Sequence, residues 1–246
     1  MGHRVTTLNV NAIEPAGSTL TIGASGDTVV ATDSVNVNTV KDAGGNTLWV
    51  SNGSGTLSSV NSGFGDSLKL ISTQTASSSA SLSFTSGIDS TYKEYIFKFY
   101  EINAASNVVD FSFQCSTDGG SNYNMTMTTT FFRAWHYAND SDVGLAYQTA
   151  RDQAQGTAFQ QLAFSSGNQA KGCMVGELHL FNPASTTYVK NFFTKTNLIS
   201  ANGSPYQLNS YVAGYVNTTT DTIDAVQFKF SSGNINAGTI RMYGVS

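Results

Sequence analysis

Charged side chains are scarce in this chain of 246 residues. They make up 11% of it, whereas an average soluble domain has about 25%. The net charge is −4 and the Lys and Arg residues are scattered, so the clustered positive charge that phosphate contacts require is missing. Nucleic acid is therefore not expected as a partner.

Long apolar runs are also missing. No segment approaches the ~20 apolar residues that a helix needs to cross a bilayer. Residues 1–15 lack the apolar stretch of a signal peptide. We therefore expect no membrane partner, and synthesis in a cytoplasm.

The chain has three prolines and no long tract of Ala, Leu, Glu and Lys. Ser, Thr and Asn together make up about a third of it; Thr favours strands, while Gly, Ser and Asn favour turns. Hydrophobic residues account for 40%, too many for a wholly disordered chain. These features predict an all-β protein.

The two cysteines, Cys115 and Cys173, carry little information. The alternation in NVVDFSFQCS places Cys115 on the same face as Phe111 and Phe113. Because free cysteine is often buried, we expect Cys115 to be a small apolar core residue.

Aromatic residues divide the chain into two parts. The first 63 residues contain only Trp49, whereas the remaining 183 are rich in Phe and Tyr at strand spacing. We expect a short β-rich stalk or arm over residues 1–63, a linker over residues 64–80 and a β-sandwich head over residues 81–246.

The N-terminal part contains only short alternating apolar pairs separated by turn sequences. Alone it buries too little apolar surface to offset the loss of chain entropy. It therefore intertwines with other copies, lies as an arm on a larger partner, or folds back on the head as a hairpin. In the first two cases, these residues contact sister subunits or anchor the chain to a particle: Leu8, Val10, Leu20, Ile22, Val35, Val37, Leu48 and Val50.

Strand signals are strong in the C-terminal part. In EYIFKFYEIN, Tyr95, Phe97 and Phe99 share one face, and similar segments recur with turns between them. One such turn is STDGGSNYN, where an Asp side chain can bond its own turn backbone and Gly supplies a positive φ. Many short antiparallel strands predict a jelly-roll-like β-sandwich.

No pattern of residues indicates catalysis. The chain contains no G-x-S-x-G nucleophile motif and no phosphate-binding glycine loop. Glu177 and His179 share a strand face, but a metal site needs at least one further ligand, and none is visible. We therefore expect no enzyme activity, no cofactor and no metal.

Trp135 and Tyr137 lie together in FFRAWHYAND, beside Arg133. Aromatic faces with adjoining polar groups commonly bind sugar rings, so these three residues are the candidate glycan contacts. The alternative is that the two aromatic residues belong to the core or to a subunit interface, where aromatic residues are also enriched.

Three segments resemble structural proteins of tailed bacteriophages, marine ones in particular. They are STLTIGASGDTVVATDS, SGIDSTYKEYIFKFYEIN and the C-terminal SYVAGYVNTTTDTIDAVQFKFSSGNINAGTIRMYGVS. The first resembles the thin N-terminal part of tail fibres, and the other two resemble a recurrent β-sandwich module. The resemblance carries no catalytic residue. It implies a virion component, often trimeric, that assembles in an infected bacterium.

We therefore expect a non-enzymatic trimeric tail fibre or tail appendage. Its N-terminal segment would contact other virion proteins, and its head would face outward, toward host-surface glycan. One alternative is a capsid decoration or cement protein whose N-terminal arm lies on the capsid. Another is a stand-alone carbohydrate-binding module. A glycan depolymerase is disfavoured because nothing marks a facing pair of carboxylates.

Overall fold

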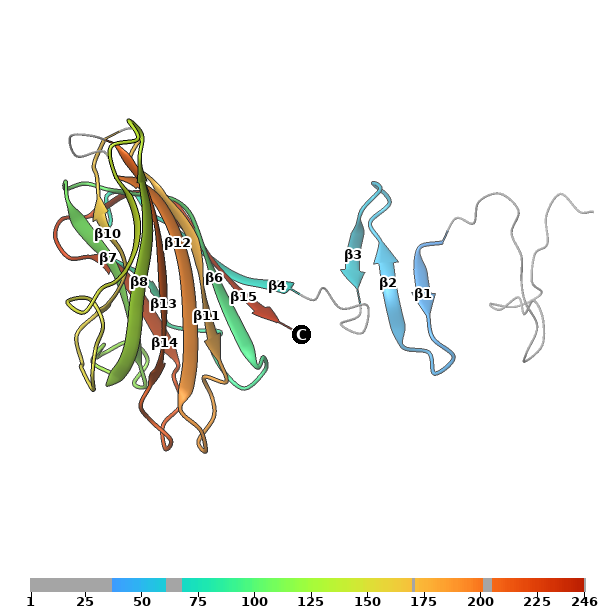
Figure 1. Ribbon diagram of the computed structural model, residues 1–246. Helices are drawn as coiled ribbons and strands as arrows, with labels where there is room; N and C mark the ends of the chain where they lie inside the picture. Colours follow the sequence, from blue (N-terminus) through green and yellow to red (C-terminus); the bar gives the residue numbers. More distant parts are fainter. Residues whose placement is uncertain (1–36, 61–67, 170, 201–204, 246) are drawn as a thin grey trace, which may run out of the picture. The chain divides into compact units, whose positions relative to one another are not determined.

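The computed structural model describes residues 37–60, 68–169, 171–200 and 205–245 (Figure 1). It divides into two units, Met1–Phe64 and Gly65–Ser246. Every regular element in the described residues is a β-strand, which confirms the predicted all-β class. None of these residues forms a helix that could cross a membrane.

The first unit contains a small antiparallel sheet. Its strands are β1 (Thr39–Lys41), β2 (Thr47–Ser51) and β3 (Leu57–Val60), in that order. Val40, Trp49 and Val60 are paired across the three strands. No side chain described between residues 37 and 60 is buried. The sheet therefore forms without a core among these residues.

The second unit contains two antiparallel sheets, a large one and a small one. The large sheet has the order β4 (Leu68–Thr75), β15 (Ile235–Val245), β6 (Glu94–Ala104), β11 (Met174–Phe181), β12 (Lys190–Ser200), β13 (Tyr206–Val216), β8 (Met127–Tyr137) and β9 (Val143–Tyr147). The small sheet has the order β10 (Gln160–Ser166), β7 (Val109–Ser116), β14 (Ala225–Phe230) and β5 (Leu82–Phe84).

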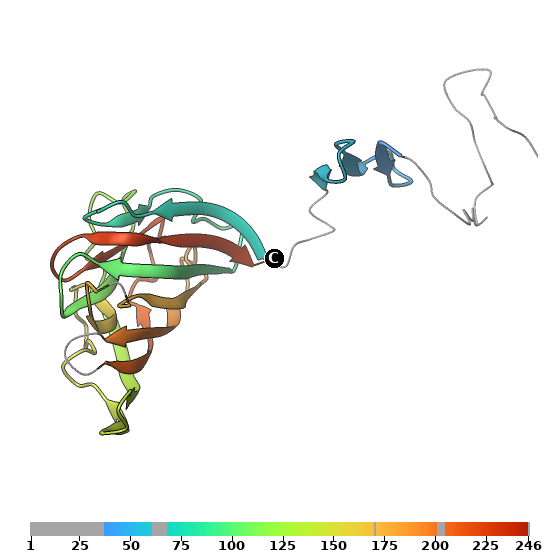
Figure 2. The same ribbon diagram turned by 90° about the horizontal axis from the view of Figure 1, so that it is seen from above.

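The chain passes back and forth between these sheets. It crosses at each step from β4 to β8, crosses again around β10 and around β14, and stays in the large sheet for β11 to β13. Figure 2 shows β4, β15 and β6 side by side at one end of the large sheet. The unit is an antiparallel β-sandwich, as predicted, and the repeated crossing is the jelly-roll-like feature.

The core lies between the two sheets and is centred on Phe228. Its ring lies 5.3–6.3 Å from five other phenylalanine rings. These rings belong to Phe84, Phe97, Phe99, Phe111 and Phe113, all at most 2% exposed. Edge-to-face and offset-stacked ring pairs both occur here, and such pairs add to the free energy gained by burying apolar area.

Period-two alternation positions this core. Tyr95, Phe97 and Phe99 of β6 all point inward, as predicted. Cys115 on β7 is fully buried, which confirms its interpretation as a core residue, and burial raises the pKa of its thiol.

The sandwich begins earlier than expected. β4 pairs with β15 along its length, although the sequence predicted a linker over residues 64–80. Among the described strands, β4 is an edge strand that pairs with β15 alone, and it buries none of its side chains fully. Because its side chains are partly exposed, hydrophobic and polar residues alternate only weakly along β4. The Ser-rich segment that follows has the composition of a linker, so the sequence predicted a linker here.

The STDGGSNYN segment forms a tight turn after β7. The carboxylate of Asp118 accepts hydrogen bonds from Ser116 Oγ (2.6 Å), from the Asn122 backbone N–H (2.9 Å) and from Asn122 Nδ2 (2.7 Å). These donors favour the charged carboxylate and lower the pKa of Asp118 to about 2. Gly119 and Gly120 supply the positive φ angles of the turn.

Candidate functional site

The three predicted glycan-contact residues lie on one face of β8. Arg133, Trp135 and Tyr137 alternate along the strand, in phase with the buried Phe131. Their side chains therefore lie on the inward face of the large sheet. They are half-buried, whereas Phe131 on the same face is fully buried. The sequence did not show which face of β8 meets the other sheet.

Arg133 is part of a stack of rings and guanidinium groups, which we call the arginine stack. Its Cζ lies 4.3 Å from the Trp135 ring centre and 4.9 Å from that of Phe164, a residue of β10. Arg151 lies on Phe164 as well, with its Cζ 3.9 Å from the ring centre. The order Trp135, Arg133, Phe164, Arg151 links β8, the strand next to the β9 edge of the large sheet, to β10, an edge strand of the small sheet.

Trp135 is held by further contacts. Its Nε1 donates a hydrogen bond to Asp142 Oδ2 at 2.8 Å. The indole lies over Gly144 of β9, where an added Cβ would be 2.5 Å from Trp135 Cζ2. The ring also packs against the edge of the core. Trp135 is thus a packing residue, and one of its ring faces is covered by Arg133.

Tyr137 lies at the end of the same strand. Its ring stacks on Tyr206 of β13, with centroids 4.8 Å apart. His136 points to the opposite face of β8 and lies 2.9 Å from Asp140. The sequence-adjacent Trp135, His136 and Tyr137 therefore do not form one aromatic surface.

The two arginines of the stack differ in their partners. Arg151 lies 3.1 Å from Asp110 Oδ2 and also donates to Gln161. Within the described part of the chain, Arg133 has neither a hydrogen bond nor an ion pair, and its Nε is buried. Directly opposite Arg133 on β13, the buried Ser210 Oγ also lacks a hydrogen-bond partner among the described residues.

The predicted anchoring residues lie in or near the first unit. Leu8, Val10, Leu20, Ile22 and Val35 fall outside the described residues. Val37 is exposed, and Leu48 and Val50 are half-buried on the face of β2 opposite Trp49. Both faces of this small sheet therefore carry apolar side chains with no described cover.

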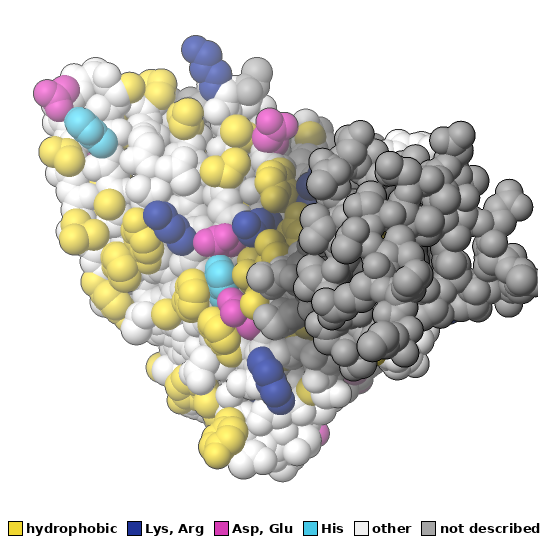
Figure 3. All heavy atoms as spheres, turned by 90° about the vertical axis from the view of Figure 1, so that its right-hand side faces the viewer, with side chains coloured by type: hydrophobic (Ala, Val, Ile, Leu, Met, Phe, Trp, Pro, Cys, Tyr) yellow, Lys and Arg dark blue, Asp and Glu magenta, His cyan; other side chains and the backbone are white. Residues whose placement is uncertain are grey.

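A second candidate surface is the side of the large sheet that faces away from the small sheet, which we call the outer face (Figure 3). Nine large hydrophobic side chains on it are 39–71% exposed, namely those of Leu70, Tyr100, Phe132, Val143, Leu145, Tyr147, Val175, Phe193 and Ile199. One register row across seven strands contains Tyr147, Phe132, Tyr211, Lys195, Glu177, Lys98 and Arg241. Aromatic residues occupy one end of this row and charged residues the other.

His179 lies on the outer face between two carboxylates. Its Nδ1 is 2.5 Å from Glu94 Oε1, its Nε2 is 3.5 Å from Glu177 Oε1, and its ring stacks on Phe193. Among the described residues, no three His, Cys, Asp or Glu side chains are grouped so that they could hold a metal ion. The cluster links β6, β11 and β12 on this face.

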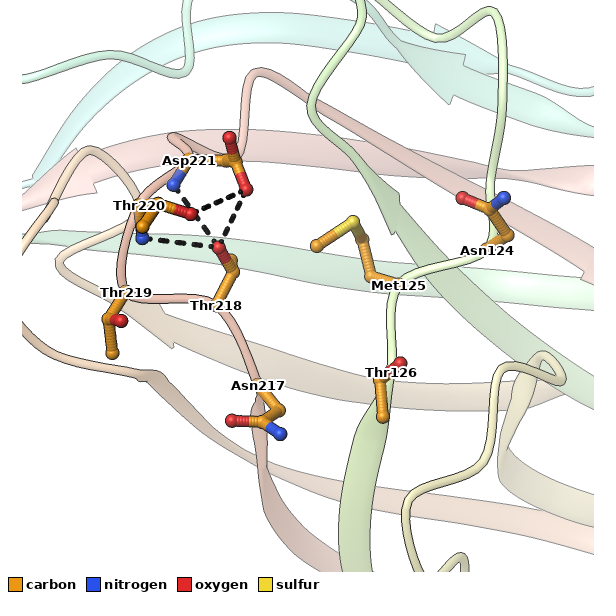
Figure 4. A pocket seen from close by; sticks show the side chains of 8 residues that line it. All are labelled: Asn124, Met125, Thr126, Asn217, Thr218, Thr219, Thr220 and Asp221. Carbon is orange, nitrogen blue, oxygen red and sulfur yellow. Dashed lines mark hydrogen bonds between the residues drawn. The ribbon is translucent and has the colours of Figure 1, made fainter.

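A hollow of about 370 Å³ lies beside the threonine-rich loop after β13 (Figure 4). Asp221 Oδ2 accepts hydrogen bonds from Thr218 and Thr220, both at 3.0 Å. The buried Lys190 Nζ donates to the carbonyls of Thr218 (2.8 Å) and Asp221 (2.6 Å). Burial lowers the pKa of Lys190. These hydrogen bonds hold the loop itself.

Comparison with known proteins found no matching protein-family model, no matching curated protein and no matching solved structure.

Proposed function

We propose that this chain is a non-enzymatic structural protein of a tailed-phage particle, and specifically a trimeric tail fibre or tail appendage. The residue patterns that resemble phage virion proteins favour this class. The structural observation that carries the proposal is uncovered apolar surface in both units, since a subunit of a larger assembly buries such surface against its neighbours.

The first unit needs a partner. Trp49, Leu48 and Val50 are only half-buried, and no side chain described in residues 37–60 forms a core. Covering the remaining exposed apolar area of such side chains stabilises a structure by about 25 cal/mol per Å². Three copies of the segment, wound together, supply that cover and make a stalk that attaches to other virion proteins.

The second unit has a surface suited to association. The nine exposed hydrophobic side chains are spread over the outer face, with charged residues among them. Interfaces combine exposed aromatic residues with a polar surround in this way. We assign this face to contacts between sister heads in the trimer.

The β9 edge gives a further reason for assembly. Val143, Leu145 and Tyr147 are 50–71% exposed on this short strand, which pairs only with β8 among the described strands. Exposed apolar edge strands favour aggregation unless they are covered. A closed trimer covers such edges in a defined way.

In this proposal the face of β8 that does not carry Phe132 stays outside the contacts between heads and faces outward. Arg133, Tyr137 and the hydroxyl-rich loops then contact host-surface glycan. A capsid decoration protein remains the second candidate, because an N-terminal segment that lacks its own core also fits an arm lying on a capsid. A monomeric carbohydrate-binding module is the third, and the two uncovered apolar surfaces disfavour it.

Labelling of particles tests the proposal. Antibodies against residues 65–246 are applied to purified phage particles whose genome encodes this chain, followed by gold labelling and electron microscopy. We expect gold at the tail. Gold over the capsid would favour the capsid decoration protein over the tail fibre. Absence of the chain from purified particles, with the chain present in the infected cells, would contradict a virion role.

A further inference from the structure

The arginine stack leaves one cation without a partner. The Arg133 guanidinium lies against two rings, with its Cζ 4.3 Å from the centre of Trp135 and 4.9 Å from the centre of Phe164. Its Nε is buried, whereas its two terminal nitrogens are not among the buried unpartnered atoms of the described residues. The edge of the guanidinium is therefore held in one orientation while its N–H donors have no acceptor in the described chain.

Ser210 adds a second donor at the same place. It is paired directly with Arg133 across β8 and β13, so the two side chains lie on the same face of the sheet. Ser210 is 1% exposed, and its hydroxyl has no described partner. A buried hydroxyl beside a buried Nε is costly unless an acceptor binds to both.

The neighbouring Arg151 shows how the chain satisfies such a group. The Arg151 guanidinium also lies against the Phe164 ring, and it donates hydrogen bonds to Asp110 and Gln161. No carboxylate among the described residues lies within ion-pair distance of Arg133. Both arginines thus contact the Phe164 ring, but only Arg151 has a carboxylate partner among the described residues.

We propose that Arg133 and Ser210 bind a carboxylate supplied by a ligand, on the inward face of β8 beside Phe164 of β10. A guanidinium offers two parallel N–H donors that match the two oxygens of a carboxylate. The carboxylate belongs either to an acidic sugar or to a simple organic acid. The proposal rests on the outward placement of this part of the head, and it names the chemical class of the glycan contacted there.

The test uses the full chain with Trp49→Phe, in which Trp135 is the only tryptophan. Its fluorescence reports on the ring that lies against Arg133. The chain is titrated with sodium glucuronate, with glucose and with sodium acetate at constant ionic strength. We expect glucuronate to change the emission and glucose to have no effect. An equal response to acetate would identify a simple carboxylate as the ligand, and a response to glucuronate alone would identify an acidic sugar.

Variants made in the same Trp49→Phe chain separate the site from general charge effects. Arg133→Gln should abolish the response. Arg133→Lys keeps the positive charge but lacks the two parallel N–H donors of the guanidinium, so it should weaken the affinity for glucuronate at least about tenfold. Arg241→Gln is the matched control, because Arg241 also lies on an aromatic ring, 5.3 Å from Tyr100, and its loss changes the net charge equally. It should leave the response intact.

Two results would overturn the proposal. One is the absence of any response to either acid in the folded parent chain, as judged by its circular dichroism. The other is a response that persists in Arg133→Gln. Neither depends on whether the chain is trimeric or on where it lies on a particle, so failure of this site and failure of the proposed function are distinguishable.

Discussion

The rings of Phe132 and Tyr211 lie parallel on the outer face, with centroids 4.9 Å apart and planes 9° from each other. The two residues are directly paired across β8 and β13, and Lys195 Nζ lies 5.7 Å from the centre of the Tyr211 ring. The rings thus stack on each other along the register row. This relationship is the centre of the surface that we assign to contacts between heads.

Replacing Phe132 with serine should weaken association without unfolding the head. Phe132 is 41% exposed, so its loss removes little core packing but breaks the ring stack on the outer face. We expect the mass of the full chain, measured by light scattering during dilution, to fall at a higher concentration than in the parent.

Tyr188→Ser is the control for this change. Tyr188 is 73% exposed and lies in the loop before β12, away from the outer face. It should leave the dilution curve unchanged. If both variants behave like the parent, the outer face does not contact sister heads.

Truncating Phe228 should destabilise the sandwich strongly. Because five phenylalanine rings surround it, Phe228→Ala leaves a cavity that the neighbours cannot fill, at a cost of about 3–5 kcal/mol. Urea unfolding measures this loss as a lower midpoint. Tyr188→Ala is the matched control, since Tyr188 is 73% exposed, and it should cost much less. Equal midpoints for the two variants would contradict this core.

Asp118 should contribute stability that depends on pH. Its folded pKa of about 2 lies below the ordinary value of 3.8, so its contribution is complete above pH 3.8 and is lost as the pH falls through about 2. The thermal midpoint of Asp118→Asn should therefore lie below that of the parent at neutral pH. The two midpoints should converge as the pH approaches 2. A constant difference down to that pH would disprove this role.

A side chain at position 144 should displace Trp135. In Gly144→Val, the new Cβ would lie 2.5 Å from Trp135 Cζ2, so the indole must leave its place and its hydrogen bond to Asp142. We expect a red-shifted Trp135 emission in the Trp49→Phe chain. Leu145→Val changes the opposite, exposed face of β9 and should leave the emission unshifted. An unshifted spectrum for Gly144→Val would mean that Trp135 does not lie over β9.

The sequence predicted the fold class well because inward and outward residues alternate clearly in the central strands. In β6 the aromatic residues Tyr95, Phe97 and Phe99 mark the core face, and Cys115 follows the same rule on β7. β4 was missed because an edge strand with half-exposed side chains shows little alternation.

The site was predicted less well because its partners come from distant strands. A period of two places Arg133, Trp135 and Tyr137 together but does not show which face of β8 meets the small sheet. Phe164 and Arg151 complete the stack through tertiary contacts that no local spacing encodes. The unpartnered state of Arg133 and Ser210 likewise becomes visible only when their neighbours are known.

The native mass of the full chain tests the central claim most directly. Light scattering gives the native mass of the purified full chain and of a shortened chain that begins at Gly65. The shortened chain lacks the first unit but keeps β4. We expect the mass of three 26.1 kDa chains for the full protein and weaker association for the shortened one. A mass of one chain for both would contradict an assembly formed through the N-terminal segment and the outer face.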